Sequence, residues 1–289
     1  MIKKKIFVIG ESGQLALCFK NEERHFLNLE LTFLNRAQVN FEKSLKNQLP
    51  SEYPFCIINT VAYTAVDSAE SQKDLNWRIN AYALEELVAW AQEGDVPIIH
   101  FSTDYVFDGA QQKDFGYVEV DEVNPQNEYG KAKLQGESTV LSYKSGIVFR
   151  IAWLYSLFGK NFLQTVLRKI GNKENMRVVN DQIGCPTSAS ALAYDILEWL
   201  NELNNWDEAP FGLFHYSHEG RVSWFEFAQE INECTGNKIQ VEAINSVQFE
   251  TVARRPYFSL LNHNLANAVF NFPTRDWKEE LQQLLNTRK

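Results

Sequence analysis

Short apolar runs recur along the first half of the chain and alternate with longer stretches of helical periodicity. The runs are "KIFVIG" (5–10), "LTFLN" (31–35), "FCIINT" (55–60), "PIIHFS" (97–102) and "GIVFR" (146–150). Runs this short and this rich in β-branched residues are typical of strands. Because they are apolar on both faces and helical stretches separate most of them, they predict a Rossmann-type doubly wound parallel sheet in an α/β protein.

The longest helical stretch covers residues 70–94. Leu75, Ile79, Leu87 and Trp90 recur in it near helical spacing, before Gly94 and Pro97 end the pattern. We therefore expect one long helix between the third and fourth strands.

After Arg150 the alternation continues with a looser rhythm. The pattern predicts helices over 160–171, 188–203 and 276–286, and strands over 177–181, 212–217 and 238–244. Ser223 and Glu226 have the spacing of a capping box at the start of a further helix. We expect a dinucleotide-binding domain over 1–150 and a smaller α/β substrate-binding domain over 151–289, with segments exchanged between the two.

Composition narrows the class of protein. Of 289 residues, 45% are hydrophobic and 22% charged, and the net charge of −9 argues against a nucleic-acid partner. No run is long enough to span a bilayer and no apolar signal segment begins the chain, so we expect no membrane partner and a cytoplasmic location. The four cysteines are scattered and lack the paired spacing of zinc sites. His215 and His218 are close in sequence, but a strand followed by a turn would point their side chains in different directions. We therefore predict no metal site.

A glycine turn follows the first strand. In "GESGQLA", Gly10, Gly13 and Ala16 stand three residues apart. Small residues here allow a tight turn and let a pyrophosphate approach the N–H groups at a helix N-terminus. A glycine turn alone could be only a turn, but its place on the first strand of a doubly wound sheet favours dinucleotide binding.

The end of the second strand bears on the choice of dinucleotide. A carboxylate there would hold the 2′-hydroxyl of NAD, whereas a cation would accept the 2′-phosphate of NADP. This chain has Asn35 and Arg36 at that place. NADPH is therefore favoured, with NADH as the alternative and a solvated loop arginine as the plainer interpretation of Arg36.

Two sets of polar residues are candidates for a catalytic role. "HFSTDYVFDG" leaves Ser102, Thr103 and Asp104 at the carboxyl end of the fourth strand, where open α/β sheets bind ligands, although "STD" is also a good helix cap. Tyr129 and Lys133, four apart, share one helix face. A phenol titrates near pH 10, and a nearby ammonium would lower that pKa and make Tyr129 a usable acid.

These segments together are similar to a known family. "GESGQLA", "STDYVFDG" and "YGKAK" resemble the extended short-chain dehydrogenase/reductase superfamily, with its Ser/Thr, Tyr and Lys. "NTVAYTAVDSAES", "RIAWLYSLFGKNF", "VNDQIGCPTSASALA", "SWFEFA" and "RRPYFSLLN" narrow the resemblance to the dTDP-4-dehydrorhamnose reductase family, over nearly the whole chain. That family implies NADPH-dependent reduction of the C4 keto group of dTDP-4-dehydrorhamnose to dTDP-L-rhamnose, in nucleotide-sugar and cell-surface polysaccharide biosynthesis.

The resemblance also implies a role for individual residues. Tyr129 would donate the proton, Lys133 would tune Tyr129 and hold the nicotinamide ribose, and Thr103 would bond the carbonyl. The cofactor would be held by Gly10, Gly13, Gln14, Leu15, Asn35, Arg36, Asn40, Phe41, Ala62, Tyr63, Thr64, Phe101, Tyr129 and Lys133. The substrate would meet Thr103, Asp104, Tyr105 and Trp153, and Asn80 would give polar support.

The family leaves some points open. Some members are magnesium-bridged dimers, but Cys18 stands where an acidic ligand would be expected, so we predict no metal and leave a homodimer as an option. Another nucleotide-sugar reductase or epimerase of the superfamily is the first alternative. A non-catalytic subunit resembling the β subunit of methionine adenosyltransferase is the second, and the intact set of Thr103, Tyr129 and Lys133 favours an enzyme.

Overall fold

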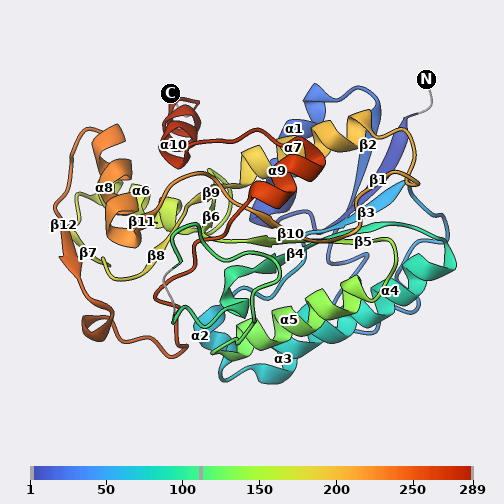
Figure 1. Ribbon diagram of the computed structural model, residues 1–289, viewed down its shortest axis with the longest axis horizontal. Helices are drawn as coiled ribbons and strands as arrows, with labels where there is room; N and C mark the ends of the chain where they lie inside the picture. Colours follow the sequence, from blue (N-terminus) through green and yellow to red (C-terminus); the bar gives the residue numbers. More distant parts are fainter. Residues whose placement is uncertain (1–2, 111–112, 288–289) are drawn as a thin grey trace.

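The computed structural model describes residues 3–110 and 113–287, and a six-stranded parallel sheet lies at its centre (Figure 1). The strands run in the order β10-β5-β4-β3-β1-β2. Their bounds are Lys4–Ile9 (β1), Leu29–Leu34 (β2), Cys56–Asn59 (β3), Ile98–Thr103 (β4), Gly146–Ile151 (β5) and Gly212–Tyr216 (β10). The doubly wound α/β class predicted from the sequence is confirmed.

Helices cover both faces of this sheet. One face carries α1 (Gln14–Glu22), α7 (Ala189–Glu202) and α9 (Asn264–Phe270), and the other carries α4 (Ala83–Glu93) and α5 (Glu128–Leu141) (Figure 1). Each layer has its own hydrophobic core: Ile6, Val8 and Phe149 point to the first, and Phe7 and Ile57 to the second. This alternation along single strands explains why the runs are apolar throughout.

The segment 70–94 forms the expected long helix over 73–93, but a π-helical turn interrupts its α-helical geometry. It follows α2 (Val66–Ala69), then forms α3 (Lys73–Trp77), a π-helical turn (Arg78–Tyr82) and α4. The π-helical turn packs closely against α5, where a Cβ on Gly136 would collide with the carbonyl oxygen of Asn80. Such turns are rare and concentrate at functional sites, and hydrophobic spacing does not reveal them.

The rest of the chain builds a smaller unit beside the carboxyl ends of β4 and β5. Its helices are α6 (Phe162–Asn172), α8 (Trp224–Cys234) and α10 (Trp277–Asn286). Its strands form three short pairs: β6 (Leu154–Tyr155) with β9 (Thr187–Ser188), β7 (Met176–Val179) with β12 (Val241–Ile244), and β8 (Ile183–Gly184) with β11 (Val222–Ser223). In the described parts of the whole chain, 3₁₀ turns cover Glu23–His25, Asp104–Val106 and Ser246–Gln248.

Two details of this second half bear on the sequence-based expectations. The capping box of α8 is confirmed, because Ser223 accepts from the Glu226 N–H at 3.1 Å while the Glu226 carboxylate accepts from the Ser223 N–H at 2.6 Å. The strand of residues 212–216 does not lie in the smaller unit: it pairs with β5 and closes one edge of the central sheet. Among the described residues, no helix has both the length and the apolar character that crossing a bilayer requires.

Candidate active site

The glycine turn sits where the winding of the sheet reverses. From β1 the chain moves to β2 on one side and then returns to β3 on the other, so a crevice opens beyond the carboxyl ends of β1 and β3. Ligands of doubly wound folds bind in this crevice. Gly10 lies there with φ +101°, and a Cβ on it would collide with the Thr60 hydroxyl. Glycine is required at this position by the backbone itself.

A cavity of about 230 Å³ occupies the crevice. It brings together six residues predicted from the sequence to bind the cofactor, namely Gly10, Gly13, Arg36, Asn40, Phe41 and Ala62. Glu11, Ser12, Val39, Glu42, Thr60, Val61 and Ile79 complete its lining and were not predicted. Thr60 and Val61 directly follow β3, and their part in the lining could have been inferred from that position.

The floor of this cavity fits a pyrophosphate. Gly13 is the N-cap of α1, no side chain caps the helix, and its first turn carries no acidic residue. A Cβ on Gly13 would meet no protein atom within 4 Å, so nothing in the fold itself demands glycine here. An uncapped helix N-terminus with an open approach is the environment that phosphate groups favour.

The other predicted cofactor residues surround the cavity rather than line it. Leu15 is buried in the core under α1, and the buried Gln14 Nε2 has no hydrogen-bond partner among the described residues. Asn35 Oδ1 accepts from the N–H of Ala37 at 2.9 Å and so shapes the turn after β2. Arg36, which does line the cavity, is exposed, and its guanidinium pairs with Glu42 at 2.5 Å.

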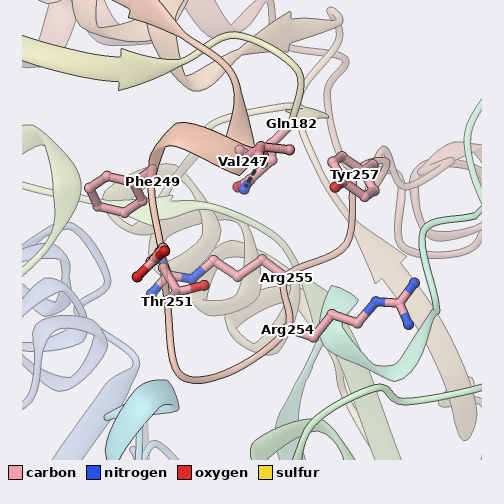
Figure 2. Close-up of a pocket in the computed structure, with 9 residues that line it drawn as sticks. Gln182, Val247, Phe249, Thr251, Arg254, Arg255 and Tyr257 are labelled. Carbon is pink, nitrogen blue, oxygen red and sulfur yellow. Dashed lines mark hydrogen bonds between the residues drawn. The ribbon is translucent and has the colours of Figure 1, made fainter.

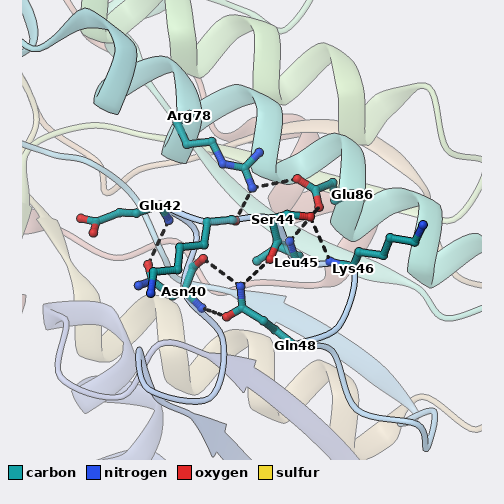
Figure 3. A network of polar contacts seen from close by, with 9 residues as sticks. Asn40, Glu42, Ser44, Leu45, Lys46, Gln48, Arg78 and Glu86 are labelled. Atoms are coloured by element: carbon teal, nitrogen blue, oxygen red, sulfur yellow. Dashed lines mark hydrogen bonds and ion pairs between the residues drawn. The ribbon is translucent and has the colours of Figure 1, made fainter.

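A polar network fixes the loop that carries Asn40 and Phe41 (Figure 3). The Glu86 carboxylate, on α4, accepts from the Ser44 hydroxyl and the Leu45 N–H, each at 2.7 Å, and from Arg78. Asn40 in turn donates its N–H to Gln48 Oε1 at 2.7 Å. The carboxylate therefore holds the wall of the cavity against the long helix, and these contacts lower the pKa of Glu86 against the opposing effect of burial.

Asn80 supports a second wall of the cofactor groove. It is 1% exposed in the π-helical turn, accepts from the Tyr63 N–H at 3.0 Å and donates to the Tyr63 carbonyl at 2.9 Å. These two bonds replace the pairing that a neighbouring strand would give and fix residues 62–64 beyond β3. Tyr63 is half-buried and Thr64 is exposed. The polar support expected of Asn80 from the family resemblance thus has a definite partner.

Thr103, Asp104 and Tyr129 come together at the carboxyl end of β4. The Thr103 hydroxyl donates to Asp104 Oδ1 at 3.0 Å and accepts from the Tyr105 N–H at 3.2 Å. Tyr129 lies in the first turn of α5, which Asn127 caps by accepting from the Gly130 N–H at 2.8 Å. Gly130 lets this turn approach the Tyr105 carbonyl closely. The Thr103 hydroxyl lies on the same side and partly lowers the pKa of the Tyr129 phenol.

The pKa of Tyr129 is raised, which reverses the direction expected from its spacing to Lys133. It is raised to about 12, chiefly by burial; the Thr103 hydroxyl lowers it in part, and the charge of Asp104 adds to the rise. Asp104 is itself buried, which raises the pKa of its carboxyl to about 6. Tyr129 is therefore held as a protonated phenol, the form in which it can donate.

Lys133 lies one helical turn further along α5 and is 2% exposed. Its Nζ donates to the Phe101 carbonyl at 2.5 Å and lies 3.3 Å from His100 Nε2. Burial lowers the pKa of Lys133 to about 7, although the charge of Glu137 raises it in part. The predicted Phe101 thus takes part through its backbone, while its ring packs in the core.

Tyr105 and Trp153 face the smaller unit. The Tyr105 ring meets Tyr129 edge-on at 5.6 Å and lines a cavity of about 840 Å³ that extends to α6, β7 and α8. Trp153 has a left-handed backbone, φ +49°, stacks on Trp224 at 3.7 Å and donates to Ser259 Oγ at 3.2 Å. Trp224 was missed from the sequence, although it is the first residue after the recognised cap of α8.

Two arginines border the outer part of this region (Figure 2). A second cavity, of about 570 Å³, is lined by Arg254 and shares Gln182, Phe249 and Arg255 with the larger one. Arg255 runs across it towards Thr251, while Arg254 extends the other way (Figure 2). Arg255 pairs with Asp67 of α2 at 2.8 Å, which fixes the loop that carries Arg255 to this helix. Within residues 3–110 and 113–287, no group of three or more His, Cys, Asp or Glu is placed to hold a metal ion.

Comparison with known proteins identifies similar chains that match most of this one. The family model described as the RmlD substrate binding domain matches residues 4–289. A dTDP-4-dehydrorhamnose reductase of Sinorhizobium fredii is 34% identical over 97% of this chain and 96% of its own, and that of Escherichia coli K12 is 36% identical over 81% and 79%.

Solved structures agree with these relatives. A dTDP-4-dehydrorhamnose reductase of Clostridium acetobutylicum has a TM-score of 0.89 at 34% identity, over 98% of this chain and 99% of its own. The reductase of Bacillus anthracis, solved in complex with NADP, has a TM-score of 0.90 at 29% identity, over 99% and 100%.

Proposed function

The chain belongs to the RmlD substrate binding domain family, and we propose that it is an NADPH-dependent reductase of dTDP-4-dehydrorhamnose that yields dTDP-L-rhamnose. The observation that carries this proposal is that Thr103, Asp104 and Tyr129 gather at the carboxyl end of β4, with Lys133 one turn further along α5. Relatives that bear this reductase name match nearly the whole chain, and one of them was solved with NADP.

The residues around the crevice suit NADPH. The N–H groups at the start of α1 and the open face of Gly13 would hold the pyrophosphate, and Arg36 would pair with a 2′-phosphate in place of Glu42. Asn40, Phe41 and Ala62 would border the adenosine part. Bound NADPH supplies the hydride.

The chemistry assigned to the chain's own residues is proton donation and charge stabilisation. Hydride addition to a ketone builds negative charge on oxygen, so two hydroxyl donors aimed at that atom stabilise the transition state more than the ground state. Tyr129 gives its proton to the C4 oxygen, and the Thr103 hydroxyl turns its hydrogen from Asp104 Oδ1 to the same oxygen when the substrate binds. In its charged form Lys133 stabilises the phenolate that remains on Tyr129.

The two larger cavities support a nucleotide-linked substrate. Tyr105 stands at the junction of the reaction centre and the 840 Å³ cavity, which has aromatic walls in Phe162 and Trp224 and a cation in Arg255. An aromatic-walled cavity with cations suits a base and a diphosphate joined to the reacting sugar. We propose that the deoxysugar lies against Trp153 and the nucleotide extends towards Arg255.

The division of labour between two domains stays a prediction. The central sheet with its helices would bind the dinucleotide, and the smaller unit would bind the substrate. Residues 189–216 and α9 come later in the chain but pack with the central sheet. A homodimer and a cytoplasmic location likewise stay predictions from the sequence.

A direct assay tests the proposal. The purified protein is mixed with dTDP-4-dehydrorhamnose and NADPH or NADH, and nicotinamide oxidation is followed at equal concentrations. We expect turnover with the 4-keto sugar, faster with NADPH, and formation of dTDP-L-rhamnose. Tight NADPH binding without turnover of this substrate would refute the assigned reaction and favour a different nucleotide-sugar substrate.

A further inference from the structure

His100 forms a buried polar chain behind the reaction centre that the proposed mechanism does not use. It lies on β4, is 1% exposed, and pairs in register with Asn59 on β3. Its Nδ1 lies 3.1 Å from Asn59 Nδ2, and its Nε2 lies 3.3 Å from Lys133 Nζ. The chain continues to the backbone, because the Val61 N–H donates to Asn59 Oδ1 at 3.1 Å.

The hydrogen bond from the Val61 N–H to Asn59 determines which ring nitrogen of His100 carries the hydrogen. An N–H can donate only to the amide oxygen, so Asn59 Oδ1 faces Val61 and the amide Nδ2 donor faces His100. His100 Nδ1 must therefore accept. A neutral imidazole that accepts at Nδ1 carries its hydrogen on Nε2, and this hydrogen faces Lys133.

An N–H donor facing Lys133 has a consequence for the lysine's charge. An ammonium group has three donors and no acceptor, so it gains no hydrogen bond from His100. A neutral amine can accept from His100 Nε2–H while donating to the Phe101 carbonyl at 2.5 Å. Burial lowers the pKa of His100 well below its ordinary value, with the lysine charge acting in the same direction, so the imidazole stays neutral.

The other charged and titratable groups around Lys133 come from α5, β4 and β5. Glu137, one turn along α5, favours the charged lysine, but its carboxylate is held by Arg150 of β5 in a fully buried pair at 2.5 Å and 3.0 Å. Tyr129 is a neutral phenol. Asp104, after β4, accepts from Thr103 and so lies on the reaction-centre side.

We propose that His100 is a positioning residue for Lys133: Asn59 holds its ring as the Nε2–H tautomer, and this N–H favours the neutral amine of Lys133 over the ammonium. The inference rests on the proposed reduction, in which charged Lys133 assists Tyr129. It makes His100 and Asn59 the groups that set the pH at which the enzyme loses that assistance.

The pH profile of turnover has a defined direction. Turnover that needs the Lys133 ammonium is present below the lysine pKa and is lost as pH rises through it. Tyr129, with a pKa near 12, does not titrate below pH 9 and so does not produce this decline. Removing the His100 Nε2–H, which disfavours the ammonium form of Lys133, moves the decline in turnover to higher pH.

Two substitutions separate this role from simple packing. His100→Phe keeps a planar ring but removes the donor, and Asn59→Asp offers a carboxylate that accepts from Nδ1–H, so that Nε2 presents a lone pair to Lys133. We expect the midpoint of the alkaline decline in kcat to rise by about one pH unit in each, and the Asn59→Asp shift to be smaller in the His100→Phe background. His218→Phe is the matched control: it removes another buried imidazole, bonded to the Ser188 N–H at 2.9 Å, and should leave the midpoint unchanged.

A spectroscopic measurement keeps the inference testable whatever the substrate proves to be. The chain has five histidines, so long-range ¹H–¹⁵N spectra of the wild-type protein contain few imidazole patterns, and His100→Phe identifies the one that matters. We expect an unprotonated Nδ1 and a protonated Nε2 from pH 6 to 9. The opposite tautomer, an imidazolium, or substitutions that lower kcat without moving the midpoint would overturn the proposal. Absence of turnover in an otherwise folded protein would overturn the proposed function instead and leave the tautomer result standing.

Discussion

The contrast between Gly10 and Gly13 gives the sharpest test of where the dinucleotide lies. Gly13→Ala adds one methyl group at a position with φ −72° and ψ 157°, which any residue adopts. No protein atom lies within 4 Å of the new Cβ, although the position lines the crevice. The substitution therefore changes the space available to a ligand and leaves the packing of the protein unchanged.

The expected effect on stability follows from two opposing terms. Replacing glycine reduces the freedom of the unfolded chain and stabilises by about 0.4–1 kcal/mol, while alanine is a poorer N-cap than glycine by a similar amount. The free energy of unfolding should stay within about 1 kcal/mol of wild type. NADPH affinity should fall at least about tenfold, or ~1.4 kcal/mol, because the methyl group occupies the approach of the pyrophosphate.

Gly10→Ala provides the comparison. Its φ of +101° costs an alanine about 1–3 kcal/mol, and its Cβ would collide with the Thr60 hydroxyl. Urea unfolding and fluorescence titration with NADPH measure both quantities for both variants. Unchanged NADPH affinity in Gly13→Ala, or a loss of stability as large as that of Gly10→Ala, would refute the placement of the cofactor.

Three further predictions concern the interior of the site. Tyr129→Phe should lower kcat at least about 100-fold while NADPH affinity stays within twofold, since only the proton donor is lost; normal turnover in a stopped-flow assay would exclude Tyr129 as the acid. Glu137→Ala should lower the free energy of unfolding by about 3–5 kcal/mol, because the Arg150 charge is left buried and unpaired; urea denaturation showing a loss below 1 kcal/mol would contradict the buried pair. The buried Asp104 has its pKa raised from 3.8 to about 6, so the folded state holds this proton more tightly and the free energy of unfolding decreases by about 2 kcal/mol as pH rises from 4 to 6; an equal slope in Asp104→Asn would show that another group is responsible.

Local chemistry along the chain was enough to predict the scaffold of the site. The apolar runs located the strands because a strand buried on both faces must be apolar at every position, as Ile57 and Ile58 are. Gly10 and Gly13 marked the turn, and the capping box of Ser223 marked the start of α8. Each of these depends on residues close together in sequence.

Features that depend on contacts between distant residues could not be predicted in this way. At the π-helical turn, Asn80 bonds to Tyr63 and its carbonyl approaches Gly136, and neither contact can be seen in the local sequence. The raised pKa of Tyr129 reflects burial by the whole fold, which the spacing to Lys133 does not report. The strand Gly212–Tyr216 resembles any other short apolar run, and only its pairing with β5 assigns it to the central sheet.

The measurement that tests the central claim most directly is single-turnover reduction of dTDP-4-dehydrorhamnose by the purified protein with NADPH, with product stereochemistry read by NMR. The arrangement of Thr103, Tyr129 and Lys133 predicts stoichiometric oxidation of NADPH and dTDP-L-rhamnose as the product, with both lost in Tyr129→Phe. NADPH that binds but is not oxidised by this substrate, or oxidation that persists in Tyr129→Phe, would contradict it.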